Sequence, residues 1–403
     1  MSRFKSKHYD IIIIGGGMCG GALALEMHAL GLKAAIIEMQ PPHTGATQPE
    51  RVIALSYGSR CHFDSLGVWK DIDALGVAPI KQISVNEADN RGCVQLHHSE
   101  ANIDALGYVV QNAHVLKGVY AHLEGKVDMY CPASVQSISL EDDAAHVCIR
   151  DAKGEKSLQG SLLVAADGTN SQIRSMAGIG TFGWDHNRFG IVASVRPEKP
   201  HEFTAFECFR SSGPLALLPL DEKRFSIVWT LKPEEASRTL SMPDIMFLRR
   251  LSRAIGADLR GRLGDMVETG SRACFPFELR QAKSRTAKRL ALIGNAAHTL
   301  HPVAGQGLNL GMRDVRTLAD AVGSAVRGKR DVGAMIVLEA YEGGRRADNA
   351  SVIGFTEGLN AVFNNELAPV KFARGWGLEG LQQLPNVKDW LLRHAAGLSQ
   401  MQT

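Results

Sequence analysis

Residues 9–20 read Tyr-Asp-Ile-Ile-Ile-Ile-Gly-Gly-Gly-Met-Cys-Gly. The apolar run is short and ends in glycines, which is typical of a buried parallel strand. Apolar residues follow at helical spacing over 22–30, and Gly31 is placed to end that helix. A second short strand is predicted over 33–38. The chain therefore opens with a β-α-β unit, the building block of a doubly wound α/β sheet.

The glycines of this segment satisfy the pattern G-x-G-x-x-G between a strand and a helix. Gly15 permits the tight turn, Gly17 lets the backbone approach a pyrophosphate, and Gly20 lets the helix pack closely on the strand. Glu38 ends the second strand, where its carboxylate can accept hydrogen bonds from a ribose. A glycine turn without a ligand is the alternative, and the motif does not distinguish FAD from NAD. The residues expected at the dinucleotide are Gly15, Gly17, Met18, Cys19, Gly20 and Glu38.

Two later segments repeat the sequence of strand and polar turn. Residues 161–166 lead into Asp167-Gly168, and residues 289–293 lead into Gly294-Asn295. Both turns are expected at the carboxyl edge of the sheet, where ligands bind in such folds. From Gly305 onward the sequence predicts a turn that opens a helix, whose free N–H groups and positive dipole end attract anions.

These motifs, in this order, resemble the class A flavin monooxygenases of the para-hydroxybenzoate hydroxylase superfamily. More closely, they resemble the ubiquinone-biosynthesis hydroxylases of the UbiH/UbiF/VisC type. The resemblance runs nearly end to end and includes 51–56, 106–110 and 213–220. It implies that the second motif serves FAD and the pyridine nucleotide, and that the third holds the ribityl chain and the flavin ring. The further FAD-binding residues expected on this basis are Arg51, Gln111, Asp167, Gly168, Arg174, Gly294, Asn295, Pro302, Gly305, Gly307, Leu308 and Asn309.

Two positions depart from the superfamily pattern. Asn295 stands where Asp is usual, and an amide can accept a hydroxyl's hydrogen bond without adding negative charge. Gln111 stands where many relatives carry Glu, and either side chain could bond the ribityl chain. Arg51 resembles the flavin-contacting arginine of the family, with a surface salt bridge as the alternative.

The resemblance also implies the chemistry. In the family, NAD(P)H reduces FAD, O2 adds at flavin C4a, and the hydroperoxide transfers oxygen to an electron-rich ring. The Gly-Asn-Ala-Ala form of the third motif favours the members that act on 2-polyprenyl-6-methoxyphenol. No side chain is singled out as a catalytic base. Four residues of the expected substrate lid are equally consistent with core or rim positions: His201, Glu207, Pro219 and Trp229.

The expected architecture is α/β, with a Rossmann-like FAD-binding domain, an inserted antiparallel-sheet substrate domain and C-terminal helices. Short β-branched and aromatic runs between 181 and 284, separated by Pro and Gly, are typical of such an inserted sheet. The FAD-binding domain is expected over 1–75, 100–180 and 285–360, the substrate domain over 76–99 and 181–284, and the helical segment over 361–403.

Composition excludes several classes of protein. Lys and Arg total 45 against 42 Asp and Glu, a net charge of +3, which is too balanced for a nucleic-acid-binding protein. The 7 cysteines form no C-x-x-C pair, which favours free thiols in a reducing compartment. No apolar run reaches the ~20 residues that span a bilayer, so a soluble, cytoplasmic protein is expected. His298 and His301 have no nearby carboxylate or cysteine, so no metal is expected.

The expected partners are a hydrophobic phenol, O2 and transient NAD(P)H. Lys371, Arg374, Lys388 and Arg393 lie among tryptophans and leucines, which suggests peripheral contact with the inner membrane, with ordinary packing as the alternative. The family also suggests a homo-oligomer or a quinone-biosynthesis complex.

Three other functions compete with this interpretation. One is a hydroxylase of another aromatic compound, or an epoxidase. A second is a low-turnover flavin-binding scaffold of a quinone-synthesis complex, which only Asn295 favours. A third is a hydride-removing oxidase, against which the segment 306–309 argues. The absence of a second G-x-G-x-x-G disfavours a separate NAD(P)H domain and the disulfide reductases.

Overall fold

The first sheet carries the three sequence motifs. The computed structural model describes residues 7–42, 50–87, 93–210, 212–299, 306–363 and 384–398. In spatial order the strands of the first sheet are β17 (Thr286–Ala287), β18 (Leu290–Leu292), β11 (Gly154–Ala165), β1 (Lys7–Ile14), β2 (Ala34–Ile37) and β8 (Asp128–Tyr130), with β10 (Ala145–Asp151) and β9 (Ala133–Leu140) joined through β11. The pairs β18–β11, β11–β1, β1–β2 and β2–β8 are parallel, so the predicted β-α-β opening is confirmed.

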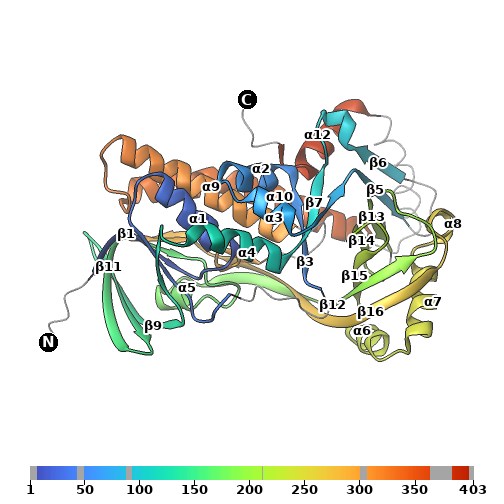
Figure 1. Ribbon diagram of the computed structural model, residues 1–403, viewed down its shortest axis with the longest axis horizontal. Coiled ribbons are helices and arrows are strands. Elements are labelled where there is room, and N and C mark those ends of the chain that lie inside the picture. Colours follow the sequence, from blue (N-terminus) through green and yellow to red (C-terminus); the bar gives the residue numbers. More distant parts are fainter. Residues whose placement is uncertain are drawn as a thin grey trace.

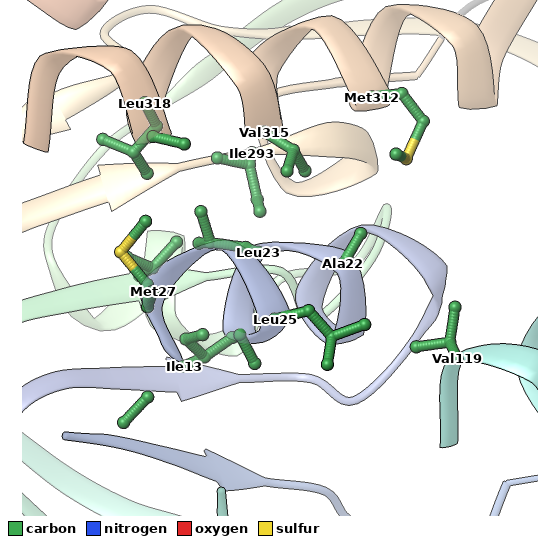
Figure 2. Close-up of a cluster of buried hydrophobic side chains, with 14 of the residues drawn as sticks. Ile13, Ala22, Leu23, Leu25, Met27, Val119, Ile293, Met312, Val315 and Leu318 are labelled. Carbon is green, nitrogen blue, oxygen red and sulfur yellow. The ribbon is translucent and has the colours of Figure 1, made fainter. Parts of the chain in front are cut away.

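Helices cover this sheet because the strands are apolar on both faces. All four residues of β2 are buried, and so is most of β1. Helix α1 (Met18–Ala29) is apolar on nearly all sides because it is held between β1 and α9 (Gln306–Arg327). Figure 2 shows Leu23 and Met27 of α1 facing α9, with Met312, Val315 and Leu318 on that helix. The other helices of this part are α2 (Tyr57–Ser65), α3 (Trp69–Ala74), α4 (Asn112–Leu123), α5 (Gln172–Met176) and α10 (Met335–Phe363).

The second sheet lies beside the first part, at the right in Figure 1. Its strands in spatial order are β19 (His298–Thr299), β16 (Met266–Ala282), β12 (Thr181–Pro197), β15 (Phe225–Leu231), β14 (Leu215–Pro219), β13 (Thr204–Phe209), β5 (Gln82–Glu87) and β6 (Cys93–His97). The long strands β12 and β16 run between the two parts of the molecule (Figure 1). Helices α6 (Pro233–Leu240), α7 (Asp244–Ala254) and α8 (Ala257–Leu263) pack against one face.

The predicted fold class is confirmed, with two differences of detail. The pair β13–β5 is parallel, whereas an antiparallel sheet was expected. Parallel neighbours need a long connection, and here residues 88–203 separate β5 from β13. Helices α6 to α8 were not predicted, because β-branched runs and Pro/Gly breaks dominate the sequence pattern of 181–284.

A small third sheet joins the two parts. It contains β3 (Val52–Ser56), β7 (Gly107–Gln111) and β4 (Val77–Ile80), all antiparallel. Strand β4 therefore pairs here, while β5 and β6, also within 76–99, pair in the second sheet. The short helix η1 (His98–Ala101) follows β6.

The last described helix, α12 (Pro385–Ala395), is bound to the body of the protein. Leu392 is buried among residues of the third sheet, and Lys388 forms an ion pair of 2.7 Å with Glu100. Trp390 is 48% exposed. Lys371, Arg374 and Trp376 lie outside the described residues. Within the described ranges, no helix has the length and hydropathy needed to cross a bilayer.

Candidate functional site

Strand register brings the sequence motifs to one edge of the first sheet. Ile14 pairs with Ala165 and Ile37, and Ala165 pairs with Leu292. The four strands therefore end level with one another. The segments that follow them, which begin at Gly15, Glu38, Ala166 and Ile293, share the carboxyl edge where ligands bind in doubly wound sheets.

The first glycine motif allows close packing and leaves one open position. Gly15 has φ +101°, and a side-chain carbon on it would lie less than 3.0 Å from the Ala166 carbonyl. A side-chain carbon on Gly20 would clash in the same way with the Gly15 carbonyl. A side-chain carbon on Gly17, by contrast, would have no heavy atom of the other described residues within 4 Å, apart from its chain neighbours and the backbone of its own helix. Gly17 precedes α1, so the amide donors and positive dipole end of that helix face open space there.

Glu38 is held in place by backbone donors. Its Oε2 accepts from the Gly16 amide at 2.6 Å, and its Oε1 accepts from the Gln40 amide at 3.0 Å. Carboxylate oxygens keep further lone pairs for a ribose hydroxyl. The buried Tyr120 hydroxyl lies beside Gly16 and has no hydrogen-bond partner among the described residues. Burial and then the charge of Glu38 raise the pKa of Tyr120 to about 12.

The second motif contains an unsatisfied acceptor oxygen on Asp167 and an arginine, Arg174, that binds the third motif. The Oδ2 of Asp167 accepts from the amides of Gln172 and Ile173 at 2.8 and 3.2 Å, whereas its Oδ1 is buried without a partner in the described part of the chain. The buried Arg174 donates to the Ala296 carbonyl at 2.9 Å and to the Thr169 carbonyl at 3.0 Å. Arg174 therefore ties the second motif to the third, with burial lowering the pKa of its guanidinium.

Small residues bring the first and third motifs together. The Cys19 sulfur lies 3.2 Å from where a side-chain carbon on Gly294 would be, and 2.6 Å from the same position on Gly311. Burial and the charge of Asp314 raise the pKa of the Cys19 thiol to about 12. The Cys19 side chain of α1 thus packs as a neutral thiol against Gly294 and against Gly311 of α9.

The third motif joins the start of α9 to strand β3. The Asn309 Oδ1 accepts from the Ser56 amide at 2.9 Å and the Ser59 hydroxyl at 2.8 Å, and its Nδ2 donates to the Ala54 carbonyl at 2.9 Å. Its side chain is therefore a clamp between α9 and β3. Asn295 is exposed, and Gly307 and Leu308 are half-buried. Pro302 and Gly305 lie outside the described residues.

Arg51 and Gln111 lie side by side where β3 begins and β7 ends. Val52 pairs with Gln111, and the Asn112 amide donates to the Arg51 carbonyl at 2.9 Å. The Arg51 guanidinium lies 5.6 Å from the centre of the Phe275 ring on β16. Arg51 therefore lies where the first part meets the second sheet.

A buried charge network around Asp314 was missed by the sequence reasoning. Its carboxylate accepts from the Gly294 amide at 2.9 Å, His298 Nε2 at 2.7 Å and Arg345 Nε at 2.7 Å. The side chains of Asp314, His298 and Arg345 have no exposed surface. Burial by itself would raise the pKa of Asp314, but His298 and Arg345 outweigh it and lower that pKa to about 2. An aspartate eight residues into an amphipathic helix gave no signal of this role.

We expect this network to make folding sensitive to acid. The pKa of Asp314 is lower in the folded chain than its usual value of 3.8, so its stabilisation is fully present above that value and is lost as pH falls toward 2. The loss should amount to about 2 kcal/mol, from the rule of 1.36 kcal/mol per pKa unit. Urea unfolding at pH 5 and pH 3 should show the stability gap between wild type and Asp314→Asn narrowing. A gap that stays constant would contradict the assignment.

Metal-ligating side chains do not gather at this edge. In the described part of the chain, no group of three or more His, Cys, Asp or Glu could hold a metal ion. His298 is hydrogen-bonded to Asp314, and His301 lies outside the described residues.

Comparison with known proteins identifies the family. The model of the FAD-binding domain family matches residues 8–356. The chain belongs to this family of FAD-dependent monooxygenases. This flavoprotein is 33% identical to the 3-demethoxyubiquinol 3-hydroxylase of Escherichia coli, over 96% of this chain and 98% of that protein. It is 32% identical to the ubiquinone hydroxylase UbiL of Rhodospirillum rubrum, over 96% of this chain and 89% of that protein.

Solved structures share the fold of the flavoprotein. It superimposes on the p-nitrophenol 4-monooxygenase PnpA of Pseudomonas putida with a TM-score of 0.77 and 17% identity, covering 99% of this chain and 100% of that one. The carboxyl edge fits FAD on its own geometry. Gly17 leaves space at a helix start, and Asp167 keeps an unsatisfied buried acceptor oxygen.

Proposed function

We propose that the flavoprotein hydroxylates a polyprenylated phenol in ubiquinone biosynthesis, using NAD(P)H and O2. The E. coli 3-demethoxyubiquinol 3-hydroxylase and the R. rubrum ubiquinone hydroxylase support this substrate class, because both proteins align over nearly the whole chain. A hydroxylase of another aromatic compound is the second candidate, since PnpA has the same fold and acts on a small phenol.

The proposal places FAD along the carboxyl edge of the first sheet. Gly17 and the start of α1 would face the pyrophosphate, and Glu38 the ribose. Asp167 would offer its unsatisfied Oδ1 to a cofactor hydroxyl, and the start of α9 would stabilise negative charge on the flavin. FAD, when bound, supplies the electron transfer from NAD(P)H and the activation of O2. Arg174, Asn309 and Asp314 would act by holding these segments in position.

The second sheet would form the substrate-binding domain, with residues 1–75, 100–180 and 285–360 forming the FAD-binding domain. The contact of Arg51 with Phe275 supports a site between the two, because it joins the expected flavin end of β3 to β16. Oxygen transfer requires that the protein exclude water from the site and hold the substrate ring in alignment.

A prenylated substrate would reach the site from a membrane. Peripheral contact through the C-terminal segment is part of the proposal, supported by the exposure of Trp390 on α12. The inner side of the same helix is held by Leu392 and Lys388, so only its outer side is available for a bilayer. A homo-oligomer or a quinone-biosynthesis complex stays a prediction from the family.

One experiment tests the proposal. Bound FAD is reduced anaerobically by NADPH, with and without a detergent-solubilised polyprenyl methoxyphenol, and O2 is then admitted. Faster reduction with the phenol and a product heavier by one oxygen atom are expected. Efficient hydroxylation of small soluble phenols alone would favour the second candidate. A protein that holds FAD but oxygenates no phenol would overturn both.

A further inference from the structure

One row of side chains crosses the second sheet on a single face. Directly paired residues of neighbouring strands point to the same face, so the strand register places them in line. From β5 to β16 the row contains Val85, Glu207, Ala216, Val228, Val192 and Ala273. Glu207 is its one ionisable side chain, and the others are small and apolar.

The two faces of this sheet differ in burial. Alternate residues of the same strands, such as Phe206, Leu217 and Ile227, are almost completely buried under α6, α7 and α8. Each member of the row keeps part of its surface accessible. Among the described residues, the face that carries the row is therefore not fully covered by side chains.

The row faces the first part of the molecule. Ala205 and Phe209 flank Glu207 on the same side of β13, and both pack in a cluster with Val109 of β7. At the other end of the row, Phe275 lies two residues beyond Ala273 on β16 and contacts the Arg51 guanidinium. The row thus runs along the junction where the proposed flavin site meets the second sheet.

The Glu207 carboxyl has no hydrogen bond or ion pair within the described ranges, although protein surrounds it closely. Burial raises the pKa of Glu207 to about 7. Glu207 is half-buried, and an ionised carboxylate in an apolar row without a donor is costly, which favours a role with a ligand over a structural one. Other titratable groups on the elements packed against this face or beside Glu207 include Glu87, Cys93, His97, Cys208, Arg210, Tyr57, Tyr108, Lys388 and His394.

We propose that Glu207 is a catalytic residue whose carboxylate accepts the proton of the substrate's phenolic hydroxyl. The hydrogen bond from the phenol to Glu207 orients the ring over the apolar row. As oxygen is transferred to the ring, the phenolic O–H bond breaks, its electron pair stays on the substrate oxygen, and the proton moves to Glu207. This keeps the ring electron-rich at the moment of attack. The inference rests on the proposed function for its substrate class.

Replacement of the carboxylate tests the role in catalysis. Glu207→Gln keeps the shape but cannot accept the proton, and exposed Glu222 in the β14–β15 turn provides the matched control Glu222→Gln. We expect Glu207→Gln to retain FAD and its reduction by NAD(P)H, while product per turnover falls about 100-fold and H2O2 takes its place. The wild-type hydroxylation rate should rise through an apparent pKa near 7, and this rise should be absent in Glu207→Gln.

A conservative variant separates catalysis from structure. Glu207→Asp should keep the pH-dependent rise at a lower rate, whereas a purely structural glutamate would make the Asp and Gln variants equally defective with an unchanged profile. Hydroxylation by Glu207→Gln at the wild-type rate, or the same pH rise in that variant, would overturn the proposal.

A binding measurement does not depend on turnover. Oxidised, FAD-loaded protein is titrated with a short-chain prenyl methoxyphenol and with its O-methyl ether, following the flavin absorbance. Wild type and Glu222→Gln should bind the phenol about tenfold more tightly than the ether, because the ether cannot donate a hydrogen bond to a charged acceptor. Glu207→Met should show no such preference for the phenol. No preference in wild type would overturn the role of Glu207. If the wild type preferred the phenol but did not hydroxylate it, the proposed function would be overturned, whereas the role of Glu207 in binding the phenol would be supported.

Discussion

Asp314→Ala is expected to lower the free energy of unfolding by about 3–5 kcal/mol, the cost of breaking a buried ion pair from one side. The substitution leaves the guanidinium of Arg345, which has no exposed surface, without its Asp314 partner. It also releases the Gly294 amide and His298, which Asp314 holds against α9. Urea or thermal unfolding measures the loss, and FAD content should fall with it because the third motif is no longer held.

The same helix offers the control. Asp320 is exposed on α9, so Asp320→Ala should change the free energy of unfolding by less than about 0.5 kcal/mol. Equal effects at the two positions would contradict the view that Asp314 joins α9 to the third motif.

Gly20→Ala is expected to weaken FAD binding about 100-fold, the equivalent of roughly 3 kcal/mol. The new carbon would clash with the Gly15 carbonyl, so α1 must move away from the turn. The helix start would then no longer aim its N–H donors at the pyrophosphate. Equilibrium titration of the apoprotein with FAD, together with its unfolding, would record both effects.

Gly17→Ala separates ligand binding from folding. No heavy atom of the described residues lies within 4 Å of the added carbon, so the unfolding free energy of the apoprotein should change by less than about 1 kcal/mol. FAD affinity should still fall, because the methyl group enters the space proposed for the pyrophosphate. Gly343→Ala, in an open position of α10, serves as the control and should leave FAD binding unchanged. Normal FAD affinity in Gly17→Ala would place the pyrophosphate elsewhere.

Local spacing was enough to predict that the motifs meet at the carboxyl edge of the first sheet. An apolar run closed by glycines and an acidic residue at the next strand end are short-range patterns, and each motif lies within a few residues of its strand. The strands predicted over 33–38 and 289–293 are found as Ala34–Ile37 and Leu290–Leu292. Family resemblance then supplied the cofactor and the class of reaction.

The roles of single side chains in the site depended on contacts between distant segments. Cofactor binding by Asn309 and Arg174 stays a prediction, and the structure adds that their side chains bind segments about 250 and 120 residues away. Asp314 looked like an ordinary helix residue, because burial and two ion pairs become visible only when α9, the third motif and α10 are packed. Such roles depend on long-range packing, which a single sequence does not display.

By itself the sequence determined the α/β class, the glycine motifs and the order of the FAD-binding segments, because these depend on neighbours along the chain. Tertiary structure alone decided which face of the second sheet is not fully covered and that Glu207 lies on it without a partner among the described residues. Alternation in a strand gives two faces, but only packing determines which face the helices cover and which faces the cofactor domain.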